Sequence, residues 1–311
     1  MTGASAPART GQPRTYEVRH VTRYTYDDAV TASYGRTFVT PRDVPGQHCR
    51  RTRVTVEPEP EIVSEHVDHF GNRTSYFEVH RAHTALTVTA VSRVDVHRTA
   101  ADLSALADLT WEQAAAAVRE LPDGGPGDPL DVVAVRDFAL PSPLVGRHGD
   151  VEAWGGQVFT PGRPVAEAVP ALVHEIYRQF TYRSGATEVG TTLPDLLRRR
   201  AGVCQDFAHL AVGVLRGVGL PARYVSGYLE TSPPPGKPRL MGADASHAWA
   251  SVLLPGLGWV DLDPTNDQFV DDRYVVTALG RDYGDVPPVV GVIFTEATAS
   301  KLHVAVDVLR V

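Results

Sequence analysis

Apolar and polar residues alternate along much of the first third of the chain, and this pattern limits the fold more than any other feature. The alternating segments are 16–21, 22–26, 53–57, 74–79 and 85–96. A period of two places successive side chains on opposite faces of a strand, which is typical of half-buried β-strands. Turn residues such as Gly71 and Asn72 separate some of the strands. We therefore expect an antiparallel β-sandwich-like domain over residues 15–98.

The residues before this domain, 1–14, are rich in Ala, Thr, Gly and Pro, and they lack the apolar stretch of a secretory signal peptide. We expect this segment to be disordered. No apolar run reaches the roughly 18 residues that a membrane span requires, so the sequence predicts no membrane partner and a cytoplasmic location. A net charge of -7 argues against nucleic acid as a partner, because such a partner needs a basic surface.

Helical periodicity replaces the alternation in the second half of the chain. Within residues 99–160, Thr110 is a good N-cap for an Ala-rich helix and 130–160 is weakly patterned, so we interpret the whole stretch as a helical and irregular linker. Apolar residues spaced by three and four then indicate helices over 165–180 and 204–217. Strand patterns follow over 222–229, 248–254 and 259–262. The sequence thus predicts an α+β unit over 161–285 and a C-terminal strand segment over 286–311.

Cys204 follows Gly202 and Val203 and opens the predicted helix 204–217. The N-terminus of a helix carries unpaired N–H groups and about half a positive charge. This field favours the thiolate form of a cysteine, and the same N–H groups can hold an oxyanion. Cys204 is therefore our candidate nucleophile. Cys49 is the other of the two cysteines and lies in a polar stretch before a strand.

A cysteine nucleophile needs a base, and the base needs an acceptor that orients it. His247 stands at the start of a predicted strand, and Asp263 stands at the end of the next one. Because a short turn joins these strands, we expect Asp263 to lie beside His247. Asp261 is the fallback for the orienting carboxylate. The sequence predicts a catalytic triad of Cys204, His247 and Asp263.

Three sequence motifs, taken in their order along the chain, resemble those of one protein family. The stretches 202–228, 246–249 and 258–265 look like the transglutaminase-like core. The region 16–96 resembles the β-rich N-terminal domain that accompanies this core in bacterial members, and 281–288 resembles the segment after it.

This resemblance implies a papain-like α+β fold in which the nucleophile helix packs on an antiparallel sheet. It also implies the same triad, with Cys204 as nucleophile, His247 as general base and acid, and Asp263 as orienting carboxylate. The family's chemistry is acyl transfer through a thioester. We expect a peptidase or amidase that hydrolyses an amide of a peptide or protein. Amine-accepting protein cross-linking and a non-catalytic binding scaffold are the alternatives.

Three further residues are candidates for the oxyanion site or the cleft: Gln205, Tyr182 and Trp249. Gln205 offers an amide next to the nucleophile, while core packing is the rival interpretation for both aromatic residues. Asp206 and His209 are interpreted as structural, because a carboxylate suits a first helical turn and His209 lies on another face of the helix. No metal-ligand motif such as HExxH or CxxC occurs, so we expect no metal and no cofactor.

Overall fold

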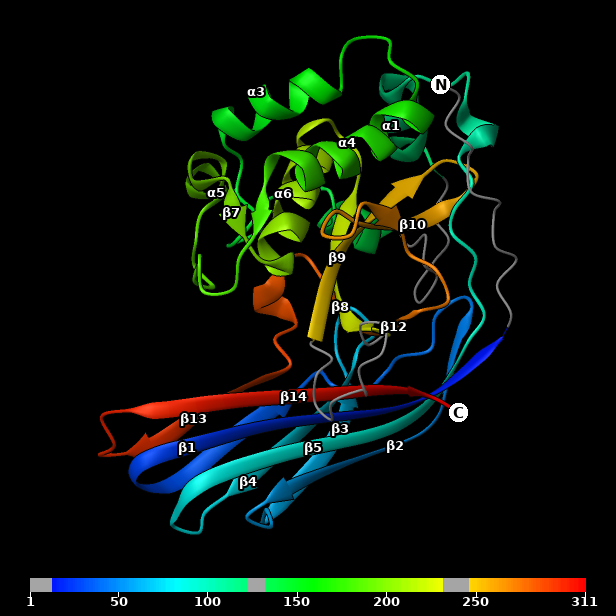
Figure 1. Ribbon diagram of the computed structural model, residues 1–311. Helices are drawn as coiled ribbons and strands as arrows, with labels where there is room; N and C mark the ends of the chain where they lie inside the picture. The colour runs from blue at the N-terminus through cyan, green and yellow to red at the C-terminus, as the bar shows by residue number, and fades with distance from the viewer. Residues whose placement is uncertain (1–12, 122–131, 232–245) are drawn as a thin grey trace, which may run out of the picture.

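Strands from both ends of the chain form one antiparallel sheet, which packs against a core of helices and shorter strands (Figure 1). The computed structural model describes residues 13–121, 132–231 and 246–311. The predicted disorder of 1–14 lies outside these ranges except for its last two residues, and Arg14 already belongs to a strand.

The larger sheet combines the N-terminal strands with two C-terminal ones. Its strands are β1 (Arg14–Thr37), β2 (Gln47–Glu57), β3 (Ile62–Val67), β4 (Arg73–Val79), β5 (His83–Val96), β13 (Val289–Thr295) and β14 (Ser300–Arg310). Their order is β2-β5-β1-β4-β3, and β13 and β14 pair with the other edge of β1. The predicted C-terminal strand therefore completes the N-terminal domain.

β1 gives this sheet its curl because it is long and bends near its middle. Its first half pairs with β5 and β14, and its second half pairs with β4 and β13. Three exposed residues, 27–29, interrupt the alternation, and the buried positions change phase between Val30 and Ser33, where the pairing with β13 is irregular. Side chains from the two halves meet in one apolar cluster: Tyr26, Val30, Val56, Phe77, Val79, Leu86 and Val88. The antiparallel, sandwich-like domain expected from the alternation is confirmed.

A five-stranded antiparallel sheet lies at the centre of the core. Its order is β11-β10-β9-β8-β12. The strands are β8 (Ala222–Leu229), β9 (Ser246–Leu254), β10 (Gly258–Asp263), β11 (Gln268–Phe269) and β12 (Tyr274–Gly280). The shorter pieces are β6 (Thr181–Tyr182), β7 (Ala201–Gly202), and the 3-10 turns η1 (Ser104–Leu106) and η2 (Tyr283–Asp285).

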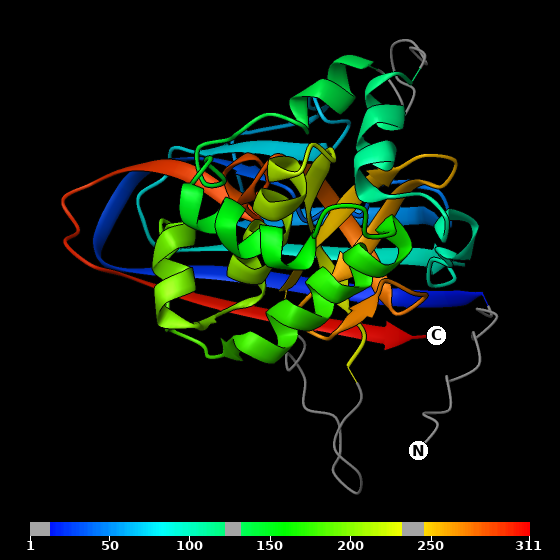
Figure 2. The same ribbon diagram turned by 90° about the horizontal axis from the view of Figure 1, so that it is seen from above.

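Helices cover this sheet when the molecule is seen from above (Figure 2). They are α1 (Trp111–Arg119), α2 (Val132–Asp137), α3 (Gly149–Val158), α4 (Val165–Gln179), α5 (Leu193–Arg199) and α6 (Cys204–Gly217). α6 lies against β8 and β9, so the expected papain-like packing of the nucleophile helix on an antiparallel sheet is confirmed. Among the described residues, no helix is long and apolar enough to cross a membrane.

The stretch 99–160, interpreted from the sequence as a linker, contributes two helices to the same core. Ala114 of α1 and Trp154 of α3 belong to one apolar cluster with residues of α4 and α6. Gly155 lets α3 approach α6 closely, because a Cβ at this position would stand 2.8 Å from Val214 Cγ1. Helix packing, rather than a connecting role, therefore explains this part of the sequence.

An apolar seam and an ion-pair cluster join the large sheet to the core. The seam packs Tyr16, Val18, Val94, Val96, Val306 and Val308 against Tyr228 and Val275. In the ion-pair cluster, Arg14 lies 2.7 Å from the Glu230 carboxylate and 2.9 Å from that of Asp272, and the Tyr16 hydroxyl donates to Glu230 at 2.9 Å. These contacts fix the sheet relative to the core.

Two adjacent glycines of α3 provide a matched test of this packing. Gly155→Ala pushes a methyl group into Val214 of α6, so we expect the free energy of unfolding to fall by about 1–3 kcal/mol. Gly156 is exposed with no atom within 4 Å of an added Cβ, so Gly156→Ala should raise it by about 0.5–1 kcal/mol. Urea unfolding measures both changes. Equal effects of the two substitutions would contradict the contact between α3 and α6.

Candidate active site

Cys204 is the first residue of α6, and the residues around it define the start of the helix. The carboxylate of Asp206 accepts hydrogen bonds from the Val203 backbone N–H at 2.8 Å and from the Thr187 hydroxyl at 2.6 Å. Gly202 leaves room for that carboxylate, because a Cβ there would lie 2.7 Å from Asp206 Oδ2. By helix geometry, the N–H groups of this first turn have no acceptor within the helix. The helix start is therefore built to leave these donors beside the sulfur.

β9 and β10 bring His247 and Asp263 together. His247 Nε2 lies 2.7 Å from Asp263 Oδ2, and Asp263 is fully buried. The carboxylate also accepts hydrogen bonds from the Tyr274 hydroxyl and the Asn266 side-chain amide, each at 2.7 Å, and from the Thr265 backbone N–H at 2.9 Å. These donors hold the carboxylate in one orientation toward the imidazole.

The same contacts set the protonation states of the pair. Burial by itself would raise the pKa of Asp263, but the charge of His247 and the hydrogen bonds hold it below its ordinary value. Burial would likewise lower the pKa of His247, but the charge and hydrogen bond of Asp263, together with Cys204, raise it to about 10. At neutral pH the pair is an imidazolium and a carboxylate.

The second ring nitrogen of His247 is available to Cys204. Nε2 is bonded to Asp263, which leaves Nδ1 for the sulfur. A side-chain hydrogen bond between Cys204 and His247 is one of the causes of the raised pKa of the imidazole. The structure therefore brings all three predicted triad residues into one connected arrangement.

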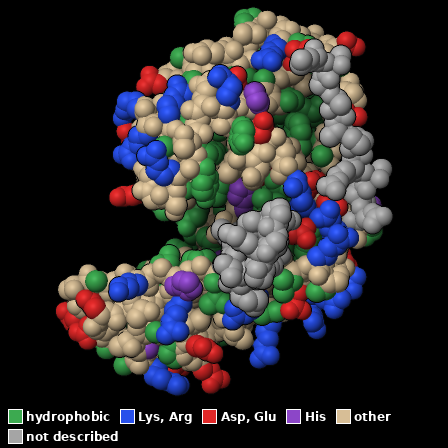
Figure 3. Space-filling view, in the orientation of Figure 1, with side chains coloured by type: hydrophobic (Ala, Val, Ile, Leu, Met, Phe, Trp, Pro, Cys, Tyr) green, Lys and Arg blue, Asp and Glu red, His purple; other side chains and the backbone are tan. Residues whose placement is uncertain are grey.

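A cavity of about 240 Å³ opens beside Cys204 and His247. Its wall combines both parts of the molecule: Tyr224, Ser226 and Tyr283 from the core, and Thr22, Tyr24, Leu302 and Val304 from β1 and β14. The surface is deeply hollowed between the helical core and the long sheet, and apolar side chains line this hollow (Figure 3). The β-domain is thus part of the candidate site.

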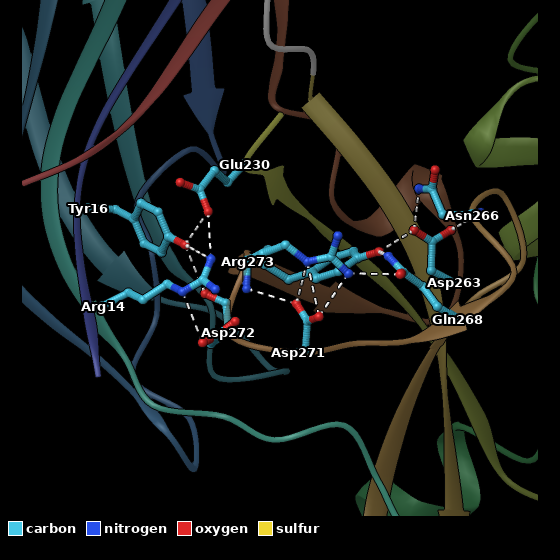
Figure 4. Close-up of polar contacts among 10 residues, drawn as sticks. Arg14, Tyr16, Glu230, Asp263, Asn266, Gln268, Asp271, Asp272 and Arg273 are labelled. Atoms are coloured by element: carbon cyan, nitrogen blue, oxygen red, sulfur yellow. Dashed lines mark hydrogen bonds and ion pairs between the residues drawn. The ribbon is translucent and has the colours of Figure 1, made fainter. Parts of the chain in front are cut away.

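A chain of hydrogen bonds runs from Asp263 toward the large sheet (Figure 4). Tyr274 donates to Asp263 and accepts from the side-chain amide of Gln268, whose oxygen accepts from Arg273 at 2.8 Å. Arg273 in turn binds the Asp271 carboxylate at 2.8 and 2.9 Å. Asp271 directly precedes the aspartate of the ion-pair cluster that holds β1. The orientation of the triad carboxylate is therefore linked to the contact between sheet and core.

The other three candidates of the sequence analysis occupy different surroundings. Gln205 lines the cavity, but its side-chain amide donates to the Val189 carbonyl at 3.4 Å. Tyr182 is 55% exposed on β6 and is not among the described residues that line the cavity. Burial and, to a smaller extent, the charge of Cys204 raise the pKa of Tyr182. Trp249 is fully buried behind His247 and packs edge-on against the Tyr274 ring.

Asp261 and His209 have partners other than the triad. Asp261 lies 3.7 Å from Arg98, so the contact with His247 belongs to Asp263 and not to the fallback residue. His209 is buried, and its Nε2 accepts the Tyr283 backbone N–H at 3.0 Å. Within the described ranges, no group of three or more His, Cys, Asp or Glu side chains is arranged to hold a metal ion.

Sequence reasoning missed Tyr224, Asn266 and Tyr274. Tyr224 is a buried wall of the cavity, where burial and then the charge of Cys204 raise its pKa well above the ordinary value. Alternation along β8, which puts Tyr224 and Ser226 on one face, was the available signal for it. Asn266 and Tyr274 carried no such signal, because their contacts with Asp263 arise from tertiary packing.

Known proteins are similar to this chain in sequence and in fold. Residues 16–95 match the bacterial transglutaminase-like N-terminal region, and residues 152–264 match the transglutaminase-like superfamily. An uncharacterized protein of Mycobacterium tuberculosis is 45% identical over 94% of this chain and 92% of its own length. The chain belongs to the transglutaminase-like superfamily.

Further similarities of this transglutaminase-like protein concern its fold and a shorter stretch of its sequence. A solved protein of Cytophaga hutchinsonii, named as a candidate cysteine protease, has a TM-score of 0.73 at 22% identity over 95% of this chain and 91% of its own. A protein-glutamine gamma-glutamyltransferase of Pseudomonas aeruginosa is 33% identical, but over only 32% of this chain and 15% of its own length. The transglutaminase-like fold is associated with cysteine protease and acyltransferase activity.

The electrostatics of this transglutaminase-like site can be tested by NMR titration of His247. In Asp263→Asn the opposing charge is lost while burial persists, so the pKa of His247 should fall from about 10 by about two pH units. Tyr177→Phe, an exposed substitution on α4, is the control and should leave the titration unchanged. An unaltered His247 titration in Asp263→Asn would contradict the pairing.

The direction of each pKa shift determines how His247 and Asp263 contribute to the stability of the fold as pH changes. The folded-state pKa of His247 lies above its ordinary value of 6.5. Its contribution to the free energy of unfolding is therefore complete below pH 6.5 and is lost as pH rises through about 10. The Asp263 contribution has the opposite sign, because its pKa is lowered. It is present above the ordinary value of 3.8 and is lost as pH falls through the folded-state pKa.

Proposed function

We propose that this protein is a thiol enzyme that transfers the acyl group of an amide to water, with Cys204, His247 and Asp263 as its triad. The observation that carries the proposal is the fully buried Asp263 carboxylate bonded to His247, whose other nitrogen is available to a cysteine at a helix start. Burying a charged carboxylate costs free energy, which indicates that Asp263 has a role beside His247. Together the three residues supply a nucleophile, a proton carrier and an orienting group.

The reaction begins with the thiolate of Cys204 and the imidazolium of His247. Sulfur attacks the amide carbonyl carbon, a C–S bond forms, and the π electrons of the carbonyl move to its oxygen. The imidazolium gives its proton to the nitrogen, the C–N bond breaks, and ammonia or an amine leaves a thioester behind. Neutral His247 then takes a proton from water, the hydroxide attacks the thioester, and the acid product departs with the thiolate–imidazolium pair restored.

The negative oxygen of the intermediate needs donors that are already in place. The free N–H groups at the start of α6 are the first of these donors. The Tyr224 hydroxyl is a second, because Tyr224 lines the cavity and its raised pKa keeps the phenol protonated. This assignment replaces Tyr182 as the tyrosine of the oxyanion site, since Tyr182 does not line the described cavity wall. Gln205 contributes its backbone rather than its side-chain amide.

The composition of the cavity wall favours water as the acceptor. Among its described lining residues there is no Asp or Glu. An alkyl amine is a cation at neutral pH, and its entry into an apolar wall without a carboxylate partner is costly. Within the described wall, the alternative of amine-accepting cross-linking therefore has no carboxylate as a recognition group. A pure binding scaffold would have no chemical need for a buried carboxylate that orients an imidazole.

Thiol labelling and a reaction assay test the proposal. Iodoacetamide near pH 7 should label Cys204 at least about tenfold faster than Cys49, because Cys49 is buried and burial raises its pKa. With casein as substrate, Cys204→Ala should lose activity by about a thousandfold or more, whereas Cys49→Ala should retain it. Full activity in Cys204→Ala would end the proposal.

The same assay identifies the acceptor. Casein is incubated with the enzyme and a dansyl-labelled primary amine. Release of ammonia or of new amino termini without dansyl incorporation is the expected result. Incorporation of the dansyl label would establish the cross-linking alternative instead.

The large sheet should contribute to substrate binding through its apolar wall. Leu302→Asp places a charge against the bound acyl group, so we expect KM to rise about fivefold or more with kcat nearly unchanged. Val292→Asp is the matched control, because Val292 is 62% exposed on β13 and does not line the described cavity. Steady-state kinetics with the casein substrate separates the two. An unchanged KM in Leu302→Asp would remove the sheet from the binding site.

A further inference from the structure

A second and larger cavity, of about 700 Å³, lies between loops of the β-domain and the outer face of the five-stranded sheet. Its described lining residues include none of those that line the cavity beside Cys204. Three arginines line it: Arg42 and Arg98 from the β-domain side, and Arg223 from β8. The mechanism described above uses none of them.

Arg223 is held in place without a polar partner in the described part of the chain. Its guanidinium lies over the Trp259 ring, with the carbon 4.1 Å from the ring centroid. Its Nε is buried and makes no hydrogen bond. The stacking fixes the plane of the guanidinium, yet it satisfies none of the N–H groups. Arg223 is thus a pre-oriented donor facing a cavity.

The other two arginines also keep buried donors that no described group accepts. Arg42 uses Nη1 to bind the Phe70 carbonyl at 3.0 Å and the Asn72 side-chain oxygen at 2.7 Å, but its Nε is unpartnered. Arg98 Nη1 is buried and has only the Asp261 carboxylate near it, at 3.7 Å, which is beyond hydrogen-bond distance. Each of the three arginines therefore retains an unused buried N–H group.

Three carboxylates line the same cavity, but none of them accepts the buried Nε–H of Arg223. Asp68 is occupied by the backbone N–H groups of Phe70 and Asn72 and by the Asn72 amide. Asp43 accepts the Cys49 backbone N–H at 2.8 Å and is 60% exposed. The charge of Asp68 acts on Arg42 and that of Asp261 acts on Arg223, but neither carboxylate accepts the buried Nε–H of its arginine.

The electrostatics of Arg223 agree with its lack of a hydrogen-bonded partner. Burial lowers the pKa of Arg223 to about 9, with Arg42 and Arg98 adding to the effect and Asp261 opposing it. An unpaired buried charge of this kind destabilises the fold until an anion enters.

One part of the apolar wall of the cavity is aromatic. The Phe70 and Phe138 ring centroids are 5.5 Å apart, and those of Phe138 and Trp259 are 5.4 Å apart. These three rings form a continuous apolar surface that ends at the Arg223 guanidinium. A ligand that fits both features has a planar anionic head and an apolar body.

We propose that this cavity binds a small organic carboxylate, whose head is held by Arg223 with Arg98 and Arg42 and whose apolar body lies on Phe70, Phe138 and Trp259. A guanidinium binds a carboxylate through two parallel N–H···O bonds, which the stacked orientation of Arg223 allows. The bound ligand touches both the β-domain and the core, so it also stabilises their contact. The proposal does not depend on the proposed catalytic function.

Isothermal titration calorimetry with 3-phenylpropionate tests the site. We expect saturable binding with one ligand per chain, and at least about tenfold weaker binding of 3-phenylpropanol, which lacks the charge. Inorganic phosphate is the comparison for a bare anion and should also bind at least about tenfold more weakly. Binding of phosphate or of the alcohol as tight as that of 3-phenylpropionate would overturn the carboxylate assignment, and so would an absence of saturable binding.

Variants locate the ligand and separate binding from folding. Arg223→Gln should weaken binding at least about tenfold, while Arg147→Gln, at an exposed arginine next to α3, should not change it. Without ligand, Arg223→Gln should melt at or above the wild-type temperature, because the substitution removes an unpaired buried charge. Unchanged affinity in Arg223→Gln, or a lower melting temperature without ligand, would overturn the proposal.

Alkylation of Cys204, which blocks the smaller cavity, provides the last control. Protein alkylated at Cys204 with iodoacetamide should bind 3-phenylpropionate as the untreated protein does. Loss of binding after alkylation would place the ligand beside Cys204 and overturn the proposal.

Discussion

The hydrogen bond between His247 and the buried carboxylate of Asp263 is the contact on which the rest of the site depends. A carboxylate in the interior costs several kcal/mol unless its lone pairs are satisfied, and here side-chain and backbone donors satisfy them. Those donors come from β9, from the turn after β10 and from β12. The register of the sheet, the turn and the position of Tyr274 must therefore all be correct before the imidazole is oriented.

The large sheet belongs to the site as well as to the scaffold. One face of β14 carries Leu302 and Val304 into the wall of the cavity and Val306 and Val308 into the apolar seam with the core. A single run of alternating residues thus forms both a wall of the cavity and a structural contact. The β-domain therefore adds a wall to the cavity of a core that already contains Cys204, His247 and Asp263.

The parts of the fold and of the site that the sequence could predict are those set by residues close together in the chain. The thiol at a helix start, the histidine at a strand start and the aspartate at the end of the next strand are each local features, and the turn between the two strands brings the last two together. The partner of the C-terminal strand was not predictable in this way, because alternation gives a strand its faces and not its neighbours. The packing of α3 on α6 depends on Gly155, whose meaning appears only beside Val214. Tyr274 and Asn266 reach Asp263 through tertiary contacts that no spacing records.

The pairing of β1 with β14 ties the beginning of the described chain to its end. During synthesis on the ribosome, β1 is made about 270 residues before β14, and one of its edges stays open until β14 has emerged. Contacts so distant in sequence form slowly, and an open strand edge is prone to wrong pairing in the meantime. The wall beside Cys204 is completed by the same late event, so a nascent chain cannot present a finished cleft to cellular proteins before β14 has emerged.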